Sequence, residues 1–220
     1  IREFCSASIA ITTPCVSLET PWMETFDANP FESDISCWNR YTGQLPASGQ
    51  IATTSLSSSS SNWNYTTGVS IGGQSYSAMY CNPYSTSQYL WLVTPSINLG
   101  DGEVAKQLAF NVGLRAYVND VAPEADPDNR FIVMVSLDNG ETWDIANGLA
   151  FVDSDENTDL NYSMLTNQMV RYFYPLVNAD GEPLTGAVRF AFYAESTVYN
   201  GDNRLCVDDI AVEDMVDCPA

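Results

Sequence analysis

The part of the sequence that most constrains the fold is a short run near its end, LCVDDIAV at residues 205–212. Apolar residues surround two adjacent carboxylates, and the run is too short for a core helix, which predicts a buried strand. Two charges in such a strand are costly unless something compensates them. Acids also flank an aromatic residue at residues 24–27, ETFD. If the two segments are neighbours, a bound cation would tie the first and last strands of one domain together.

The charge of the chain restricts its partners. Its 220 residues include 28 Asp and Glu against 8 Lys and Arg, with no His and a net charge of −20. Such a surface repels nucleic acid and anionic membranes, while its carboxylates are the oxygen donors that Ca²⁺ prefers. The lack of His and of closely spaced Cys pairs argues against zinc or haem. No window approaches the length of a membrane span, so we expect no direct membrane insertion.

Short runs of alternating apolar and polar residues dominate the chain, and no segment shows the 3.6-residue period of a capped helix. Strands are expected at residues 75–80, 89–95, 108–118, 131–137, 168–176, 187–194 and 205–212. Residues 50–73 are rich in Ser, Thr, Asn and Gly and are expected to form a long surface excursion that carries Trp63 and Tyr65. This pattern predicts an all-β sandwich with long loops.

Five sequence pieces in a fixed order resemble the jelly-roll domain shared by MAM domains and the cleaved-adhesin modules of gingipain-type proteins. They are FD at 26–27, CW at 37–38, YLWLVTP at 89–95, SLDNGETW at 136–143, and VRFAFYAES at 188–196 followed by LCVDDIAV. The resemblance implies a jelly-roll β-sandwich of two antiparallel sheets over residues 24–214. The family usually has Glu where this chain has Asp27, which leaves the ligand set of a bound ion open.

The two ends of the chain resemble pieces of other modules. Residues 1–15, IREFCSASIAITTPC, resemble the last two strands of a fibronectin type III module of bacterial surface proteins. A plain terminal hairpin of the main domain is the alternative. Residues 16–23 are then a connector, and residues 215–220, with Cys218-Pro219, resemble the start of a linker or a further module. The resemblance implies one part of an exported, multi-domain bacterial surface protein.

Three carboxylates are candidate ligands of a structural Ca²⁺: Asp27, Asp208 and Asp209. Strand alternation places Asp208 and Asp209 on opposite faces, so only one is expected to reach the ion. The resemblance favours Asp209, because related jelly rolls usually place the acid directly before the apolar residue. Alternatively, one carboxylate faces solvent and the other caps a turn.

A second candidate metal site is a loop with alternating oxygen donors, formed by Asp153, Asp155, Asn157 and Asp159. Thr158 stands where an EF-hand needs Gly, and Met164 stands where it needs a bidentate Glu, which excludes an EF-hand. A looser calcium loop and a solvated acidic turn both remain open. Asp120, Glu124, Asp126 and Asp128 form a comparable acidic cluster.

The sequence SLDNGETW at residues 136–143 fits the Asp-box pattern S-x-D-x-G-x-T-W. Asp138 is expected to accept hydrogen bonds from turn amides, Gly140 to take a positive φ, and Trp143 to pack under the hairpin. The box occurs once, whereas a propeller needs a repeated motif. We therefore interpret it as a motif that stabilises a β-hairpin rather than as a sign of glycosidase activity.

Aromatic residues in or beside polar loops are the main candidates for ligand binding: Trp63, Tyr65, Tyr84, Tyr117 and Tyr199. Their rings can stack on sugars, although tyrosine is also common at sandwich surfaces. Trp38, Trp91 and Trp143 are better explained as core residues. The absence of His removes the usual general-base schemes, and we expect no enzyme.

The sequence supports three functions. The first is a non-catalytic adhesion or interaction module at the bacterial outer cell surface, binding host or matrix protein or a neighbouring module through its loops. The second is a carbohydrate-binding module of a secreted glycosidase, and the third is a structural spacer.

Six scattered cysteines suit disulfides in an oxidising compartment. Cys5 and Cys15 flank a hairpin short enough for their Cα atoms to lie within the roughly 4.4–6.8 Å that a disulfide needs. Cys37 with Cys81 is a plausible second pair, which leaves Cys206 and Cys218. In the alternative, Cys206 stays free as a small buried residue, and Cys218 pairs within a downstream module.

Overall fold

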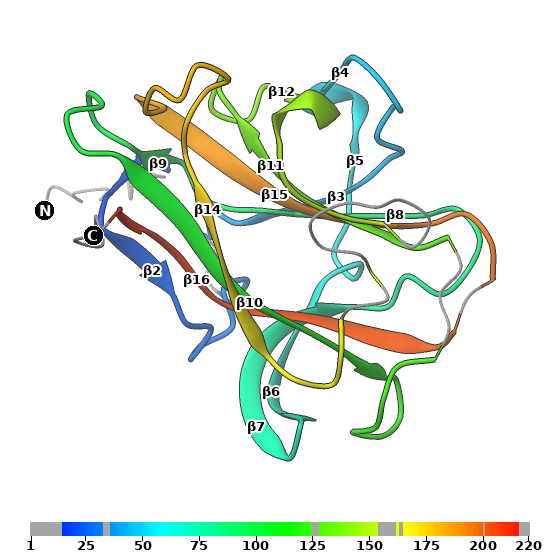
Figure 1. Ribbon diagram of the computed structural model, residues 1–220. Coiled ribbons are helices and arrows are strands. Elements are labelled where there is room, and N and C mark those ends of the chain that lie inside the picture. The colour runs from blue at the N-terminus through cyan, green and yellow to red at the C-terminus, as the bar shows by residue number, and fades with distance from the viewer. Residues whose placement is uncertain are drawn as a thin grey trace, which may run out of the picture.

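The structure of this chain, a computed structural model, describes residues 15–32, 36–124, 128–153, 162, 165–199 and 201–215. Its strands form a jelly-roll β-sandwich of two main sheets, with β10, β14 and β16 in front of β8, β11 and β15 in Figure 1. Every strand pairing is antiparallel except that of β1 with β9. The described residues contain no α-helix. Their helical elements are two short 3-10 helices, and neither is long and apolar enough to cross a membrane.

The first sheet contains eight strands in the order β1-β9-β15-β8-β3-β5, with β11 beside β15 and β13 beside β11. Their bounds are β1 (Leu18–Glu19), β9 (Ile97–Asn98), β15 (Ala187–Ser196), β8 (Gln88–Val93), β3 (Asn39–Thr42), β5 (Ser57–Ser58), β11 (Arg130–Ser136) and β13 (Gly148–Asp153).

The second sheet runs in the order β14-β10-β16-β7-β6, with β2 also paired to β16. Its strands are β14 (Val170–Pro175), β10 (Lys106–Ala116), β16 (Asn203–Asp214), β7 (Gln74–Cys81), β6 (Asn64–Ile71) and β2 (Trp22–Glu24). A separate two-stranded sheet pairs β4 (Gln50–Ala52) with β12 (Thr142–Asp144), and each of these strands leads into a short 3-10 turn, η1 (Thr53–Ser55) and η2 (Ile145–Asn147).

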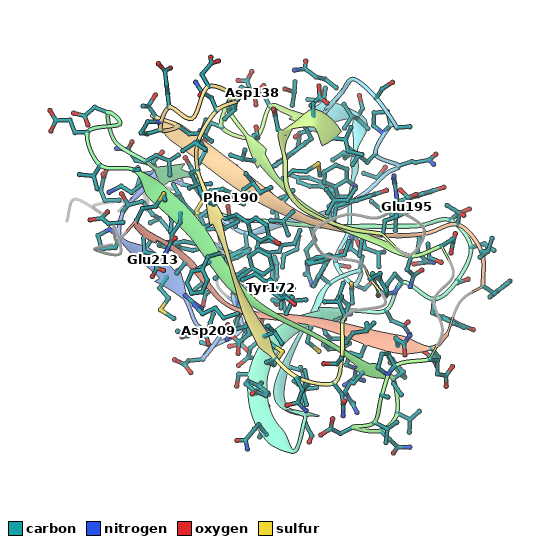
Figure 2. All side chains as sticks on the ribbon, in the orientation of Figure 1. Asp138, Tyr172, Phe190, Glu195, Asp209 and Glu213 are labelled. Atoms are coloured by element: carbon teal, nitrogen blue, oxygen red, sulfur yellow. A yellow bond between two sulfur atoms is a disulfide. The ribbon has the colours of Figure 1, made fainter. Side chains whose placement is uncertain are left out.

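Strand β15 shows why the core has two parts. Val188, Phe190 and Phe192 point between the sheets into the main core, where Phe190 is labelled in Figure 2. Ala191 and Tyr193 point to the other face, where a second apolar cluster contains Trp91 and Trp143. The residues around β4 and β12 cover this outer face, so the middle of β15, residues 190–194, is buried on both sides and apolar at every position.

The expected strands are all present, but residues 50–73 differ from the expectation. They contain β4, β5 and β6, and β6 is a full member of the second sheet, paired with β7. Trp63 is fully buried in the main core rather than exposed. Polar strands with many Ser and Thr residues lack the alternation that marks a half-buried strand, which is why composition alone suggested a loop. Residues 16–23, expected as a connector, contribute β1 and part of β2.

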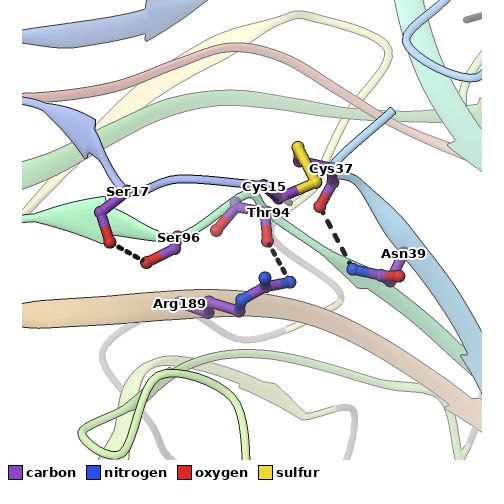
Figure 3. Close-up of a disulfide and its surroundings, with 7 residues drawn as sticks. All are labelled: Cys15, Ser17, Cys37, Asn39, Thr94, Ser96 and Arg189. Carbon is purple, nitrogen blue, oxygen red and sulfur yellow. Dashed lines mark hydrogen bonds between the residues drawn. A yellow bond between two sulfur atoms is a disulfide. The ribbon is translucent and has the colours of Figure 1, made fainter. Parts of the chain in front are cut away.

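The cysteine pairing differs from the prediction. A disulfide joins Cys15 to Cys37, with Cα atoms 5.7 Å apart (Figure 3). The predicted Cys5–Cys15 and Cys37–Cys81 pairs are therefore wrong. Cys206 and Cys81 are free and buried, so the remaining Cys206–Cys218 pair is wrong as well. Cys5 and Cys218 themselves lie outside the described residues.

The physical reason for the Cys15–Cys37 pairing is the parallel contact of β1 with β9. Leu18 pairs with Ile97, and the Ser17 and Ser96 hydroxyls are 2.6 Å apart. This contact brings the residues before β1 next to the start of β3, where Cys37 accepts a hydrogen bond from Asn39 (Figure 3). The predicted pairing assumed a local hairpin, whereas this contact joins residues 79 positions apart in the sequence.

Candidate functional site

Two regions hold side chains of functional interest: an acidic patch where β2 meets β16, and a groove at one end of the sandwich. The acidic patch consists of Glu24, Asp27, Asp208 and Asp209. The predicted neighbourhood of the two segments is confirmed, because Glu24 on β2 pairs directly with Ile210 on β16. Strands β2 and β16, which lie near the two ends of the chain, are thus joined by antiparallel pairing.

A β-bulge shapes the acidic patch. The register between β10 and β16 shifts between Ala109 and Asn111, and Asp209 has a φ of 48°, a conformation that Asp tolerates better than most residues. Val207 and Ile210 both point into the main core, which leaves Asp208 and Asp209 together on the outer face. The prediction of opposite faces is therefore wrong, because it assumed an unbroken strand.

Phe26 anchors the other half of the patch. Its side chain is fully buried, and its ring centroid is 5.4 Å from that of Trp38. Its backbone N–H donates to Glu24 Oε1 at 2.8 Å, and its φ is 49°. Burial of this ring fixes residues 24–27 beside β16, which holds Asp27 and Glu24 next to Asp208.

The electrostatics of the patch concentrate on Asp208, which is only 5% exposed. Burial raises the pKa of its carboxyl to about 7. The negative charges of Asp209, Asp27 and Glu24 raise this pKa further, while a hydrogen bond from the Asp209 N–H lowers it. No lysine or arginine of the described residues forms an ion pair with it. Negative charge is thus gathered here, and no described ion pair involves the patch carboxylates.

Hydrogen bonds already occupy several oxygens of the patch. Asp209 Oδ2 accepts from Asn111 at 2.7 Å, and Asp27 Oδ2 accepts from the Thr25 hydroxyl at 2.7 Å. Arg171 donates to the carbonyl oxygen of Asp209 at 3.0 Å. Within the described ranges, no three His, Cys, Asp or Glu side chains converge into a group that could hold a metal ion. Ca²⁺ at this place therefore remains a prediction.

The other acidic segments have different outcomes. Residues 154–160, including Asp155, Asn157 and Asp159, lie outside the described residues, and only the backbone of Asp153 is described, at the end of β13. In the comparable cluster, Asp120 accepts hydrogen bonds from Gly72, Gly73 and Ser70, and Asp128 accepts from the Thr197 N–H. These two carboxylates hold separate loops, and Asp126 lies outside the described residues.

The Asp box is built as predicted. The pKa of Asp138 is lowered to about 2, although burial alone would raise it. The hydrogen bonds that lower it come from the hydroxyls of Ser136 and Thr142 and from the N–H groups of Thr142 and Glu141. Gly140 has a φ of 90°. Trp143 is buried and donates its indole N–H to the Thr53 hydroxyl at 2.8 Å. Asp138 lies at the edge of the molecule in Figure 2.

The groove lies at the end of the sandwich where β7 leads into β8, and its volume is about 360 Å³. Its lining residues are all uncharged, and almost all present a hydroxyl or an amide: Thr42, Ser59, Ser61, Asn62, Asn64, Tyr80, Asn82, Ser87, Gln88, Leu90 and Tyr117. We call this the loop-end groove. An uncharged lining is notable in a chain with 28 acids, since it presents hydrogen-bond donors and acceptors without repelling or attracting net charge.

A second cavity of about 350 Å³ adjoins the loop-end groove and shares Tyr117 with it. Its lining residues are Ala116, Tyr117, Val118, Asn119, Val121, Glu124 and Asp202. Val118 is 78% exposed and Val121 is 52% exposed. This neighbour is therefore apolar and acidic, in contrast to the loop-end groove.

The loops around both cavities are held in place by hydrogen bonds. Tyr117 donates its N–H to the carbonyl oxygen of Asp202 at 2.8 Å. Asp202 Oδ1 accepts from Asn82 at 2.8 Å, and Asp202 donates its N–H to Glu124 at 3.1 Å. Asp120 fastens the same loop to the β6–β7 turn, and the hydrogen bond from Gly73 is the largest of those that lower its pKa. A groove with fixed walls loses little conformational entropy when a ligand binds.

The aromatic residues predicted to bind ligand lie in different environments in the structure. Tyr117 lines the loop-end groove. Trp63 does not, because it is buried, and the prediction of an exposed ring there is wrong. Tyr65 is half-buried against the core and donates its hydroxyl to the Asp27 carbonyl at 3.3 Å. Tyr84 is 40% exposed, with its ring centroid 6.1 Å from that of the exposed Tyr199.

Sequence reasoning missed most of the groove. Gln88, Asn64 and Asn82 gave no signal, because each is an ordinary polar residue near a strand end. Tyr80 was placed in a strand but not considered as a ligand residue. Trp38, Trp91 and Trp143 are buried as predicted.

No protein-family model and no curated protein sequence matches this chain. Among solved structures, it is similar to the K1 cleaved adhesin domain of Lys-gingipain from Porphyromonas gingivalis, at 13% identity over 90% of this chain and 99% of that chain, with a TM-score of 0.47. This is the kind of domain that the order of sequence motifs suggested.

Two carbohydrate-binding domains are similar to this chain as well. One is the N-terminal cellulose-binding domain of β-1,4-glucanase C from Cellulomonas fimi, at 13% identity over 94% of this chain and 100% of that chain, with a TM-score of 0.43. The other is the family 11 carbohydrate-binding module of a cellulosomal cellulase from Clostridium thermocellum, at 14% identity over 91% and 99%, with a TM-score of 0.42.

Proposed function

We propose that this chain is a non-catalytic, glycan-binding module of an exported bacterial cell-surface protein. The observation that carries the proposal is the loop-end groove, whose lining is uncharged and rich in hydroxyl and amide groups. Sugars present many hydroxyls that need both donors and acceptors, and their apolar ring faces stack on aromatic side chains. The disulfide between Cys15 and Cys37 supports an oxidising, extracellular location.

Binding of a host or matrix protein is the second candidate, and a separate observation favours it. Val118, Val121, Tyr84 and Tyr199 are exposed on loops near the groove. Exposed apolar and tyrosine side chains of this kind are typical of protein interfaces. A standard protein interface buries roughly 800 Å² per partner, however, and so needs a broader surface than a groove.

A glycan array with the purified chain tests the proposal, followed by calorimetric titration of the oligosaccharides that bind. We expect Tyr117→Ala and Gln88→Ala to weaken binding roughly tenfold or more, because each removes a lining side chain. Phe173→Ala is the matched control, since Phe173 is also exposed but lies on β14, away from the groove. Silence on the array together with binding to a matrix protein would replace this proposal by the second candidate.

We also propose that the acidic patch takes up a structural Ca²⁺. The donor chemistry fits a hard cation, since Glu24, Asp27, Asp208 and Asp209 offer only carboxylate oxygens. Support comes from the buried Asp208 carboxyl, which forms no ion pair with a described lysine or arginine. Such an ion would hold residues 24–27 against β16 without taking part in ligand binding. The test is the effect of Ca²⁺ and of a chelator on thermal stability, described in the Discussion.

A further inference from the structure

Two of the eight basic residues lie side by side on adjacent strands. Arg115 on β10 pairs directly with Arg204 on β16, so both side chains project from the same face of the sheet. Like charges placed directly opposite each other destabilise a sheet. In a chain with a net charge of −20, such a pair is unexpected.

Neither arginine has an ionic partner in the described part of the chain. The ion pairs found there are Lys106–Asp214 and Arg130–Glu195. Arg115 is only 6% exposed, and a terminal nitrogen of its guanidinium donates to the Tyr117 carbonyl oxygen at 3.2 Å. The Nε atoms of Arg115 and Arg204 are both buried without a partner. A guanidinium has five N–H donors, and burying them unpaired is costly.

Arg204 is not itself a lining residue of the loop-end groove, but it packs against two residues that are. Its Cζ atom is 4.4 Å from the ring centroid of Tyr80 and 4.7 Å from that of Tyr117, and both tyrosines line the groove. Cation–π attraction holds the guanidinium against the two rings. A guanidinium packed on aromatic rings keeps its N–H donors in the plane of the group, the geometry that binds a carboxylate or a sulfate.

We infer that the glycan bound in the loop-end groove carries an anionic group, a carboxylate or a sulfate ester, which is held by Arg204 with support from the adjacent Arg115. This inference rests on the proposed glycan-binding function and names the chemical class of its ligand. The groove lining contains no carboxylate to repel such a group. Glu124 and Asp202 line the neighbouring cavity instead, and their carboxylates would repel an anionic group there.

Matched pairs of oligosaccharides test the inference on the unaltered chain by calorimetric titration. One pair is a galacturonate oligosaccharide and its carboxyl-reduced counterpart, and the other is a heparin fragment and its desulfated counterpart. We expect the charged member of at least one pair to bind roughly tenfold or more tightly than the uncharged or less charged member, as a charge-assisted hydrogen bond to arginine implies. The pair that shows the difference identifies the anionic group.

Variants locate the effect. We expect Arg204→Gln to remove the preference for the charged oligosaccharide, and Arg204→Lys to retain part of it, because lysine keeps the charge but not the planar fork. Arg171→Gln is the matched control, since Arg171 also lies over an aromatic ring of the same sheet, at 5.4 Å from the centroid of Phe173. Melting curves of each variant show whether it is folded.

Three results of these titrations would contradict the inference. Equal or tighter binding of the uncharged members would overturn this inference and leave the proposed glycan binding in place. A charge preference that survives unchanged in a folded Arg204→Gln variant would also overturn it. If neither pair binds although other glycans on the array do, this inference fails and the proposed function stands, whereas silence on the array as well would refute both.

Discussion

The indole N–H of Trp63 donates a hydrogen bond to the carbonyl oxygen of Leu90, at 3.2 Å. Arg40 in turn donates to the carbonyl oxygen of Trp63 at 2.8 Å. Trp63 thus connects the Ser-rich segment before β6 to β8 and β3 of the other sheet. The position of the groove-lining residues on either side of it, Asn62 and Asn64, depends on this buried ring.

We expect Trp63→Ala to destabilise the whole domain rather than to remove one ligand contact. Truncation of a buried Trp typically costs about 3–5 kcal/mol, from lost burial and the cavity left behind. The measurement is urea unfolding followed by circular dichroism. Trp63→Phe, which keeps most of the volume, should cost less. A variant that unfolds at the same urea concentration as the original chain would contradict this placement of the ring.

Removal of the disulfide should lower stability without changing the fold. The bond between Cys15 and Cys37 closes a loop with a sequence separation of 22 residues, for which chain entropy gives about 3 kcal/mol. We expect Cys15→Ser and Cys37→Ser to lower the free energy of unfolding by similar amounts, and the double variant by no more than either. Cys81→Ser serves as a comparison at a free cysteine. Peptide mapping that links Cys15 to any other cysteine would refute the pairing.

The Asp box should stabilise the chain only while Asp138 is ionised. Its pKa is lowered to about 2 from the model-compound value of 3.8, so this contribution is present above about pH 4 and is lost as the pH falls towards 2. At pH 6, we expect Asp138→Ala to cost about 1–3 kcal/mol through unsatisfied hydrogen-bond donors. The difference between the variant and the original chain should shrink between pH 4 and pH 2. A constant difference across this range would contradict the hydrogen-bonding account of Asp138.

Calcium should raise the melting temperature if an ion binds the acidic patch in the folded state alone. At a concentration 100 times Kd, the gain is about 2.7 kcal/mol, which corresponds to a rise of about 5–10 °C for a chain of this size. Asp208→Asn should abolish the response. Without calcium, this variant should be at least as stable as the original chain, because a neutral amide replaces a buried charge. A chelator that leaves the melting temperature of the original chain unchanged would rule out the ion.

Sequence alone predicted the strands that carry strong apolar alternation. In β15, Val188, Phe190 and Phe192 alternate with residues of the other face. This period of two indicates a strand and shows which of its faces points into the main core. The Asp box was equally predictable, since its hydrogen bonds are local to residues 136–143. Features of this kind depend on neighbours in the sequence and need no knowledge of the sheet order.

The features that escaped prediction all depend on distant contacts or on irregular backbone. The bulge at Asp209 reversed the expected direction of one carboxylate, and the β1–β9 contact decided the disulfide. The loop-end groove joins side chains from both sheets, such as Gln88 and Asn64, whose identities are unremarkable one by one. Only the fold brings them together with Tyr117.

The most direct test of glycan binding at the loop-end groove is a titration of the isotope-labelled chain with an oligosaccharide selected on the array, followed by two-dimensional NMR of the backbone amides. The groove predicts shifts concentrated at Asn64, Gln88 and Tyr117, with little change at Asp209 on the acidic patch or at Phe173 on β14. Shifts centred on either of those two positions, or no shifts at saturating oligosaccharide, would contradict the assignment of this groove as the binding site.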